Sequence, residues 1–266
     1  MKRLICLLTM AAMLFLLFSC GDKAADNDSD SDEKQGNAEE SGNAPDSGGE
    51  ENSEAPEEPK EEAPPTEPEP PADPTGSCEF IDIDKTTRGD WVGNYGNDGY
   101  LVLSRDIADE IPAYASVDFW DIDDNMPPHH VWYQESETDE SELSEEQIED
   151  IARRKPGALY TDPSKTDCAA SCYYNGTGVV LDIDIGSETK YITVYSLDWD
   201  EQGRETEITV YDGSGKVKLV PAMEISEFSG GVYVKFKASG QISLEYYNLT
   251  GGQNAVIGAV FFDNVE

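Results

Sequence analysis

The sequence is short of basic residues. Its 266 residues include only 18 Lys and Arg against 56 Asp and Glu, a formal net charge of −38. Nucleic-acid binding needs clustered Lys and Arg to neutralise phosphates, and docking on anionic lipid needs a comparable basic cluster. The composition therefore argues against nucleic acid as a partner and against peripheral attachment to an anionic membrane surface.

Histidine is equally scarce. His129 and His130 are the only two, and they are adjacent. Adjacent histidines rarely reach one metal ion, and two histidines give no basis for a zinc site or a Ser–His–Asp arrangement. No Gly-x-Ser-x-Gly motif is present, and the many carboxylates single out no glycosidase pair. We therefore expect a non-catalytic protein without a catalytic cofactor.

The one long hydrophobic run lies at the N-terminus. Lys2 and Arg3 precede residues 4–18, in which Thr9 is the only polar residue. A membrane-spanning helix needs about 20 apolar residues, whereas a secretory signal core is shorter. The following Leu17-Phe18-Ser19-Cys20 resembles the bacterial lipoprotein signal. That resemblance implies a signal peptide at 1–20, lipidation of Cys20 and an envelope protein anchored to a membrane, facing the periplasm or the exterior. An ordinary signal peptide with a chance cysteine is the alternative.

Residues 21–77 lack Val, Ile, Leu, Met, Phe, Trp and Tyr altogether. They hold 9 of the 15 prolines, and 19 acidic against 3 basic residues. Such a segment has nothing to bury against an ordering entropy of ~1–2 kcal/mol per residue. We predict a disordered acidic linker rich in Pro, Glu, Asp and Ser, serving either as a spacer or as passive filler.

Residues 78–266 are predicted to form one β-sandwich domain. Short apolar segments alternate with polar residues, are rich in β-branched and aromatic types, and are separated by glycine-containing turns. The clearest are 99–103, 179–185, 191–197, 207–211, 232–236, 242–246 and 255–262. About ten strands spaced in this way indicate an all-β, antiparallel, jelly-roll-like β-sandwich.

One short surface helix is expected inside this domain. Ser144-Glu-Glu-Gln147 forms a capping box, and Pro156-Gly157 ends the segment. Apolar residues are few within it, so we place the helix on the surface, in an acidic insertion at 134–157.

Five segments of the domain carry a family resemblance. They are 84–100, which contains Gly-Asp-Trp-Val-Gly-Asn-Tyr-Gly, and 111–115, 197–204, 208–212 and 251–263. Together they resemble a bacterial sandwich module that is appended to secreted glycoside hydrolases and is regarded as carbohydrate-binding-like. The resemblance implies a jelly-roll-like sandwich and a sugar or polymer ligand, but no catalytic residue. Residues 121–157 are longer and more acidic than the pattern.

The first candidate binding residues are Asp198, Trp199 and Arg204. An aromatic face beside hydrogen-bonding groups is typical of sugar recognition. The alternative is a strand corner, with Trp199 in the core and Arg204 paired to a carboxylate. Asp198 and Asp200 also resemble the first half of a calcium loop, although Thr209 takes the place of the final Glu. A structural Ca²⁺ there is a weak candidate.

Further aromatic residues lie elsewhere. Trp91 and Tyr95 lie in the glycine-rich entry loop and are candidate ligand contacts, unless Trp91 closes one end of the sandwich. Trp120, Trp132 and Tyr133 flank the acidic region and form either a second aromatic patch or part of the core.

Three cysteines remain after Cys6 and Cys20. In an exported chain, we favour a disulfide from Cys78 to Cys168 or Cys172. A local Cys168–Cys172 bridge and free thiols are the alternatives.

Taken together, these features predict a non-catalytic, membrane-anchored envelope lipoprotein whose β-sandwich binds glycan or polysaccharide. The alternative is a structural or protein–protein interaction domain that serves adhesion or assembly.

Overall fold

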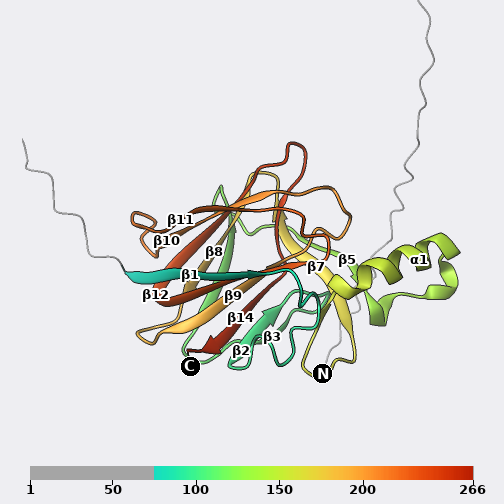
Figure 1. The fold of residues 1–266 in the computed structure, drawn as a ribbon, viewed down its shortest axis with the longest axis horizontal. Helices are drawn as coiled ribbons and strands as arrows, with labels where there is room; N and C mark the ends of the chain where they lie inside the picture. Colours follow the sequence, from blue (N-terminus) through green and yellow to red (C-terminus); the bar gives the residue numbers. More distant parts are fainter. Residues whose placement is uncertain (1–74, 266) are drawn as a thin grey trace, which may run out of the picture. The chain divides into compact units, whose positions relative to one another are not determined.

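The computed structural model describes residues 75–265. The predicted signal peptide, Cys20 and nearly all of the predicted linker lie outside these residues. Within them, ten strands form one hydrogen-bonded sheet that folds over into two layers, and four further strands form a smaller sheet (Figure 1). None of the helices in 75–265 has the length and apolarity to cross a membrane.

The first layer is built around the N-terminal half of the longest strand, β12. Its neighbours pair in an antiparallel manner. In spatial order the layer contains β1 (Gly76–Asp84), β12 (Val232–Asn248), β9 (Lys190–Ser196), β14 (Ala259–Asn264), β2 (Gly99–Val102) and β3 (Ala108–Glu110).

The second layer continues from the C-terminal half of β12, which pairs with β10 and β8. Its order is β11 (Lys218–Ile225), β10 (Thr206–Asp212), β12, β8 (Gly178–Asp184) and β4 (Ser116–Asp121). Gly240 lies where β12 passes from one layer to the other, with a φ of 71°. Glycine adopts this left-handed conformation without steric cost, so it allows a single strand to serve both layers.

The smaller sheet lies beside the sandwich and contributes the walls of the sites described below. It contains β13 (Ala255–Ile257), β7 (Cys168–Asn175), β5 (His129–Gln134) and β6 (Leu159–Tyr160). A register shift between Val131 and Tyr133 interrupts the pairing of β5 with β7.

The central strands β9 and β14 of the first layer are buried on both faces, to which their successive side chains point in turn. On β9 and β14, Val194 and Phe262 enter the core between the two layers. Their neighbours Tyr195 and Phe261 enter a second core with Trp91. This double burial explains why the sequence of β14 reads as a continuous apolar run.

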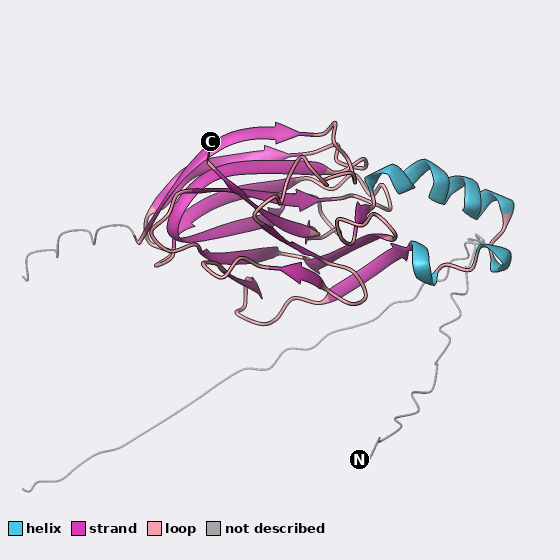
Figure 2. Cartoon of the chain, turned by 90° about the horizontal axis from the view of Figure 1, so that it is seen from below, coloured by secondary structure: helices cyan, strands magenta, loops and turns pink. Residues whose placement is uncertain are grey.

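The insertion carries helix α1 (Glu145–Arg154) and three single turns, η1 (Glu135–Glu137), η2 (Glu140–Glu142) and η3 (Lys155–Gly157). The helix projects from one end of the layered strands (Figure 2). Ser144 Oγ accepts a hydrogen bond from the Gln147 N–H at 3.2 Å, and the Gln147 side chain accepts one from the Ser144 N–H at 2.9 Å. No residue of the helix is buried. The predicted capping box and the surface position are therefore confirmed.

The predicted all-β antiparallel sandwich is likewise confirmed, but individual strands differ from the expectation. The segments 232–236 and 242–246 are one strand rather than two. Conversely, the run 255–262 is divided at Gly258, whose N–H donates to Tyr195 O at 2.8 Å. Strand β1 was not predicted, and it begins at Gly76, inside the segment assigned to the linker.

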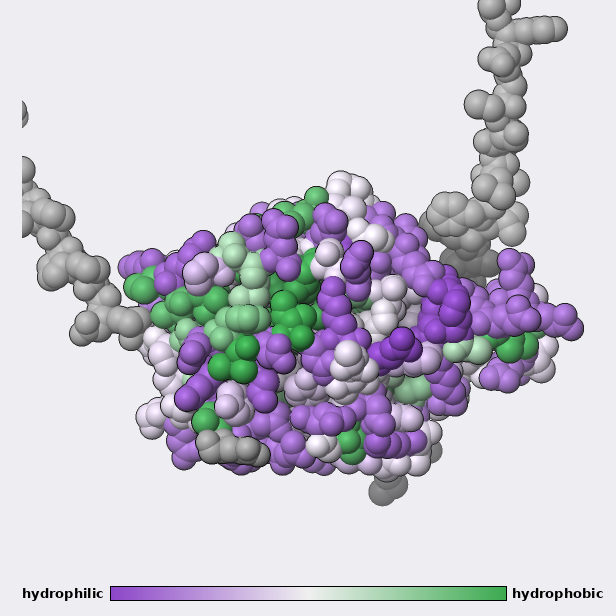
Figure 3. Space-filling view, viewed as in Figure 1, coloured by the Kyte–Doolittle hydropathy of each residue, from purple (hydrophilic) through white to green (hydrophobic). Residues whose placement is uncertain are grey.

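An apolar patch lies along β1, at the edge of the first layer. Phe80 and Ile81 are both 38% exposed. Figure 3 shows hydrophobic side chains gathered on this face of the molecule.

Candidate functional site

The turn after β9 is organised by one buried carboxylate. Asp198 is 3% exposed and accepts hydrogen bonds from the backbone N–H groups of Gln202 at 3.1 Å and Gly203 at 2.9 Å. Glu201 and Gly203 take left-handed φ values of 54° and 68°, which close the turn. The same carboxylate also accepts from the guanidinium of Arg204.

Arg204 occupies the position where the calcium hypothesis placed an ion. Its guanidinium donates to both Asp198 and Asp200, and the Arg204 side chain is only 4% exposed. A cation is therefore already present between the two carboxylates. Within residues 75–265, no group of three or more His, Cys, Asp or Glu side chains has a metal-binding arrangement. A Ca²⁺ ion at Asp198 and Asp200, as the sequence suggested, would have to compete with this guanidinium for both carboxylates.

Two predicted stacking platforms are buried. Trp199 is 6% exposed and stacks on Tyr133, with ring centroids 5.4 Å apart and planes 9° apart. Trp91 is 1% exposed, and its indole N–H donates to Tyr160 O at 2.7 Å. Neither indole face is open to a ligand, so both tryptophans belong to the second core, as the alternative reading of each proposed.

Tyr95 is half-buried rather than open. Its ring stacks on Tyr233, with centroids 4.4 Å apart, and its hydroxyl donates to Asp84 Oδ2 at 2.9 Å. Burial and the hydrogen bond to Asp84 raise the pKa of Tyr95 well above its ordinary value. These contacts give Tyr95 a role in holding the entry loop.

An aromatic cleft opens beside Arg204, on the smaller sheet. Its volume is about 220 Å³. Its aromatic wall consists of His130, Trp132 and Tyr174, and its polar wall of Asp200, Arg204 and Asn254. We call it the Trp132 cleft.

The aromatic wall comes from two adjacent strands. His130 and Trp132 on β5 meet edge to face with centroids 5.2 Å apart, and His130 meets Tyr174 on β7 in the same manner at 6.2 Å. Tyr174 pairs with Val256 of β13, and Asn254 directly precedes this strand. The pairing of three strands therefore brings these side chains to one place.

On the polar wall, the Arg204 guanidinium has one N–H donor without a hydrogen-bond partner among the described residues. The Arg204 guanidinium lies 5.5 Å from the centre of the Trp132 ring. Its Nε is buried and has no hydrogen-bond partner among the described residues. A buried donor without a partner is costly, and because Arg204 Nε is closed to solvent it is equally closed to a ligand oxygen.

The charge of the cleft is close to neutral. Arg204 is balanced by Asp198 and Asp200, which leaves an excess of one carboxylate. Both carboxylates are engaged by the guanidinium. The arrangement therefore offers aromatic faces, a guanidinium N–H, a carboxylate edge and an amide, which suit hydroxyl groups on a compact apolar ring.

Sequence reasoning found part of this cleft. Arg204 was predicted, and Trp132 was included in a second aromatic patch, but His130, Tyr174 and Asn254 were missed. The spacing of His130 and Trp132 by two residues in a strand was the available signal, because such residues face the same side. No sequence signal placed β7 and β13 next to them.

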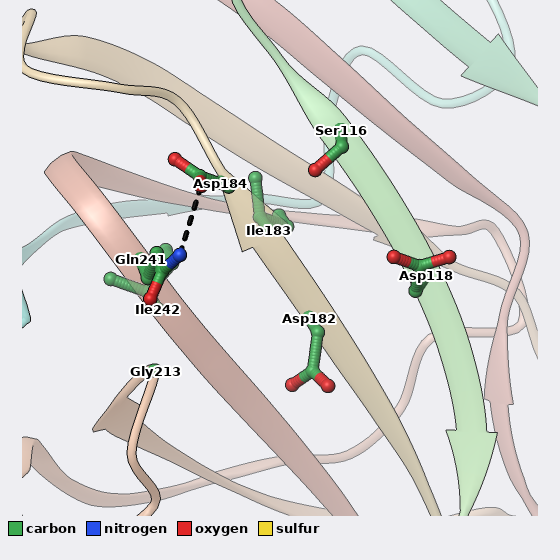
Figure 4. A pocket seen from close by; sticks show the side chains of 8 residues that line it. All are labelled: Ser116, Asp118, Asp182, Ile183, Asp184, Gly213, Gln241 and Ile242. Carbon is green, nitrogen blue, oxygen red and sulfur yellow. Dashed lines mark hydrogen bonds between the residues drawn. The ribbon is translucent and has the colours of Figure 1, made fainter.

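A second recess lies on the exposed face of the second layer. Asp118 and Asp182 are opposite each other on β4 and β8, and Figure 4 shows their carboxylates beside the strands with Asp184 and Gln241 nearby. Asp184 accepts from Gln241 Nε2 at 3.0 Å. Trp120, two residues along β4 from Asp118, is 38% exposed. We call this recess the Asp118 groove.

The three cysteines of the domain are free thiols, so the preferred disulfide from Cys78 is corrected. Cys168 and Cys172 lie four residues apart on β7, which separates their Cα atoms by about 13 Å, too far for a bridge. Burial raises the pKa of Cys78 and of Cys168 to about 12, and hydrogen bonding to Glu135 adds to the shift at Cys168.

Comparison with known proteins gives no family. No family model matches the chain, and no curated protein matches it. Among solved structures, the chain has a faint likeness to the carbohydrate-binding module TmCBM61 in complex with β-1,4-galactotriose. The identity is 12%, the match covers 30% of this chain and 70% of the module, and the TM-score is 0.12. A likeness at that level carries no argument about the ligand.

Proposed function

We propose that this protein is a non-catalytic carbohydrate-binding protein that recognises a neutral sugar residue in the Trp132 cleft. The observation that carries the proposal is one cleft that combines an aromatic wall with polar groups, among them the guanidinium of Arg204. Aromatic rings bind the apolar face of a sugar ring, while converging polar groups bind its hydroxyls.

The size and charge of the cleft define the ligand. Ligand pockets commonly enclose about 300–1,000 Å³, so a cleft of about 220 Å³ has room for little more than one ring. The excess carboxylate disfavours anionic sugars. We therefore infer that the ligand is a neutral sugar at a chain end or branch rather than a long stretch of polymer.

A glycan array probed with the full-length chain tests this proposal. Trp132→Ala removes the aromatic wall and should abolish binding to every glycan recognised by the wild type. Trp120→Ala is the matched control, because it removes an exposed indole beside the Asp118 groove. If only Trp120→Ala loses binding, the ligand binds in the Asp118 groove instead. If the wild type binds no glycan on the array, the proposal is refuted.

We also propose that the domain is displayed from a bacterial membrane by a lipid on Cys20. Support comes from the sequence before the domain: an apolar run of signal-peptide length, Ser19-Cys20, and an acidic segment without large apolar residues. Two acyl chains would hold the protein firmly at a membrane. Mass spectrometry of the mature chain should find Cys20 lipidated at the N-terminus, and an unmodified Cys20 would refute this part.

A further inference from the structure

A larger cleft is lined both by the segment that precedes the entry loop and by the end of the helical insertion. Its volume is about 550 Å³. One wall is formed by 87–90 and the other by the insertion and the strands that flank it, with Glu135, Lys155, Tyr160 and Lys165 among the lining residues. We call it the Arg88 cleft.

The charge of this cleft is opposite to that of the domain. Residues 78–266 hold 37 acidic and 13 basic residues, yet Arg88, Lys155 and Lys165 all line the cleft, against Asp90 and Glu135. Lys155 pairs with Glu135, and Lys165 pairs with Asp90. Arg88 makes no side-chain hydrogen bond or ion pair with any other residue of 75–265, so one positive charge is left uncommitted.

The backbone holds Arg88 in a strained conformation. Its φ is 55°, in the left-handed region that is unfavourable for a residue with a Cβ. The Arg88 carbonyl accepts from the Tyr233 hydroxyl, and the next N–H, of Gly89, donates to Pro156 O at 2.8 Å. A Cβ on Gly89 would lie 1.8 Å from Ala158 O. The surroundings therefore fix the loop against the insertion.

We propose that the Arg88 cleft is a second binding site, specific for an oxyanion, a carboxylate or phosphate group of a ligand. A guanidinium binds such groups through two parallel N–H bonds. Lys155 and Lys165 line the same cleft. Each ammonium has three N–H donors, so it can contact the incoming anion while it keeps its carboxylate partner. The acidic domain does not prevent this, because at 0.15 M salt charges more than about 8 Å away are largely screened. The Arg88 cleft and the Trp132 cleft have no lining residue in common.

Titration of the full-length chain at 0.15 M NaCl, followed by amide NMR, tests the proposal. The probes are sodium glucuronate, inorganic phosphate and, as the neutral control, glucose. Saturable shifts at residues 87–90 and 152–158 with either anion, but not with glucose, are expected. A response to glucuronate alone identifies an acidic sugar as the ligand, and a response to phosphate alone identifies a phosphorylated one.

Two variants and one control complete the test. Arg88→Gln should weaken anion binding about tenfold or more, as expected for loss of a charge-assisted contact. Arg88→Gly removes the same charge but accepts the positive φ, so it guards against a folding defect. Arg105→Gln, which removes an exposed Arg paired with Glu137, should leave binding unchanged. No saturable response to either anion, or equal binding by both Arg88 variants and the wild type, would overturn the proposal.

Discussion

Removal of the Asp198 carboxylate should destabilise the domain strongly. Asp198 and Arg204 have side-chain exposures of 5% and 4%, and Asp198 also accepts from three backbone N–H groups. Removing one partner of a buried ion pair costs about 3–5 kcal/mol. Asp200 still contacts Arg204 in the variant, but it does not replace the acceptor for the three amides. We therefore expect Asp198→Ala to lower the free energy of unfolding by about 3–5 kcal/mol.

Urea denaturation and thermal melting measure this loss. For a domain of this size, the melting temperature should fall by roughly 6–20 °C. Asp198→Asn retains one oxygen acceptor but not the charge, so its loss should be smaller. Asp150→Ala, which breaks surface ion pairs with Arg153 and Arg154, is the control and should change little. A loss of less than about 1 kcal/mol for Asp198→Ala would refute the buried ion pair as the organiser of the turn.

Three further predictions concern stability and the thiols. Arg88→Gly should raise the free energy of unfolding by roughly 0.5–1 kcal/mol in urea denaturation, because glycine accepts the left-handed φ; a decrease would contradict the inferred strain. Burial disfavours the charged form of Asp84, but hydrogen bonds from Thr86, Thr87 and Tyr95 outweigh this and hold its pKa well below its ordinary value. The contribution of Asp84 to the free energy of unfolding is therefore complete above about pH 4 and is lost as the pH falls further. Asp84→Asn should flatten the decline of stability on the acid side, and an unchanged decline would exclude this role. Iodoacetamide without reductant should alkylate Cys78, Cys168 and Cys172 only after unfolding; a requirement for prior reduction would reveal a disulfide.

The strands and the helix could be predicted largely from local patterns. Alternation in β8 and β9 and the capping box at Ser144 are local signals, and each led to the right element. The long strand β12 was predicted as two segments, 232–236 and 242–246, with Gly240 between them. In the structure, Gly240 keeps both halves in one strand while it redirects the chain between layers.

The binding surface could not be predicted in the same way. For the glycine-flanked Trp91 and the strand-terminal Trp199 the sequence left both exposure and burial open, and the second buried face of the first layer covers both. Asp198 and Asp200 resembled a calcium loop because the carboxylates do surround a cation, and that cation is Arg204. The Trp132 cleft depends on the pairing of β5, β7 and β13, and pairing between strands distant in sequence leaves no local pattern.

The four tryptophan indoles provide the most direct test of sugar binding in the Trp132 cleft. Indole N–H signals of the full-length chain can be assigned with Trp→Phe variants and followed by NMR during titration with a glycan identified on the array. The Trp132 signal should shift and saturate, while those of buried Trp91 and of Trp120 stay in place. Saturating binding that shifts Trp120 and leaves Trp132 unchanged would contradict the account.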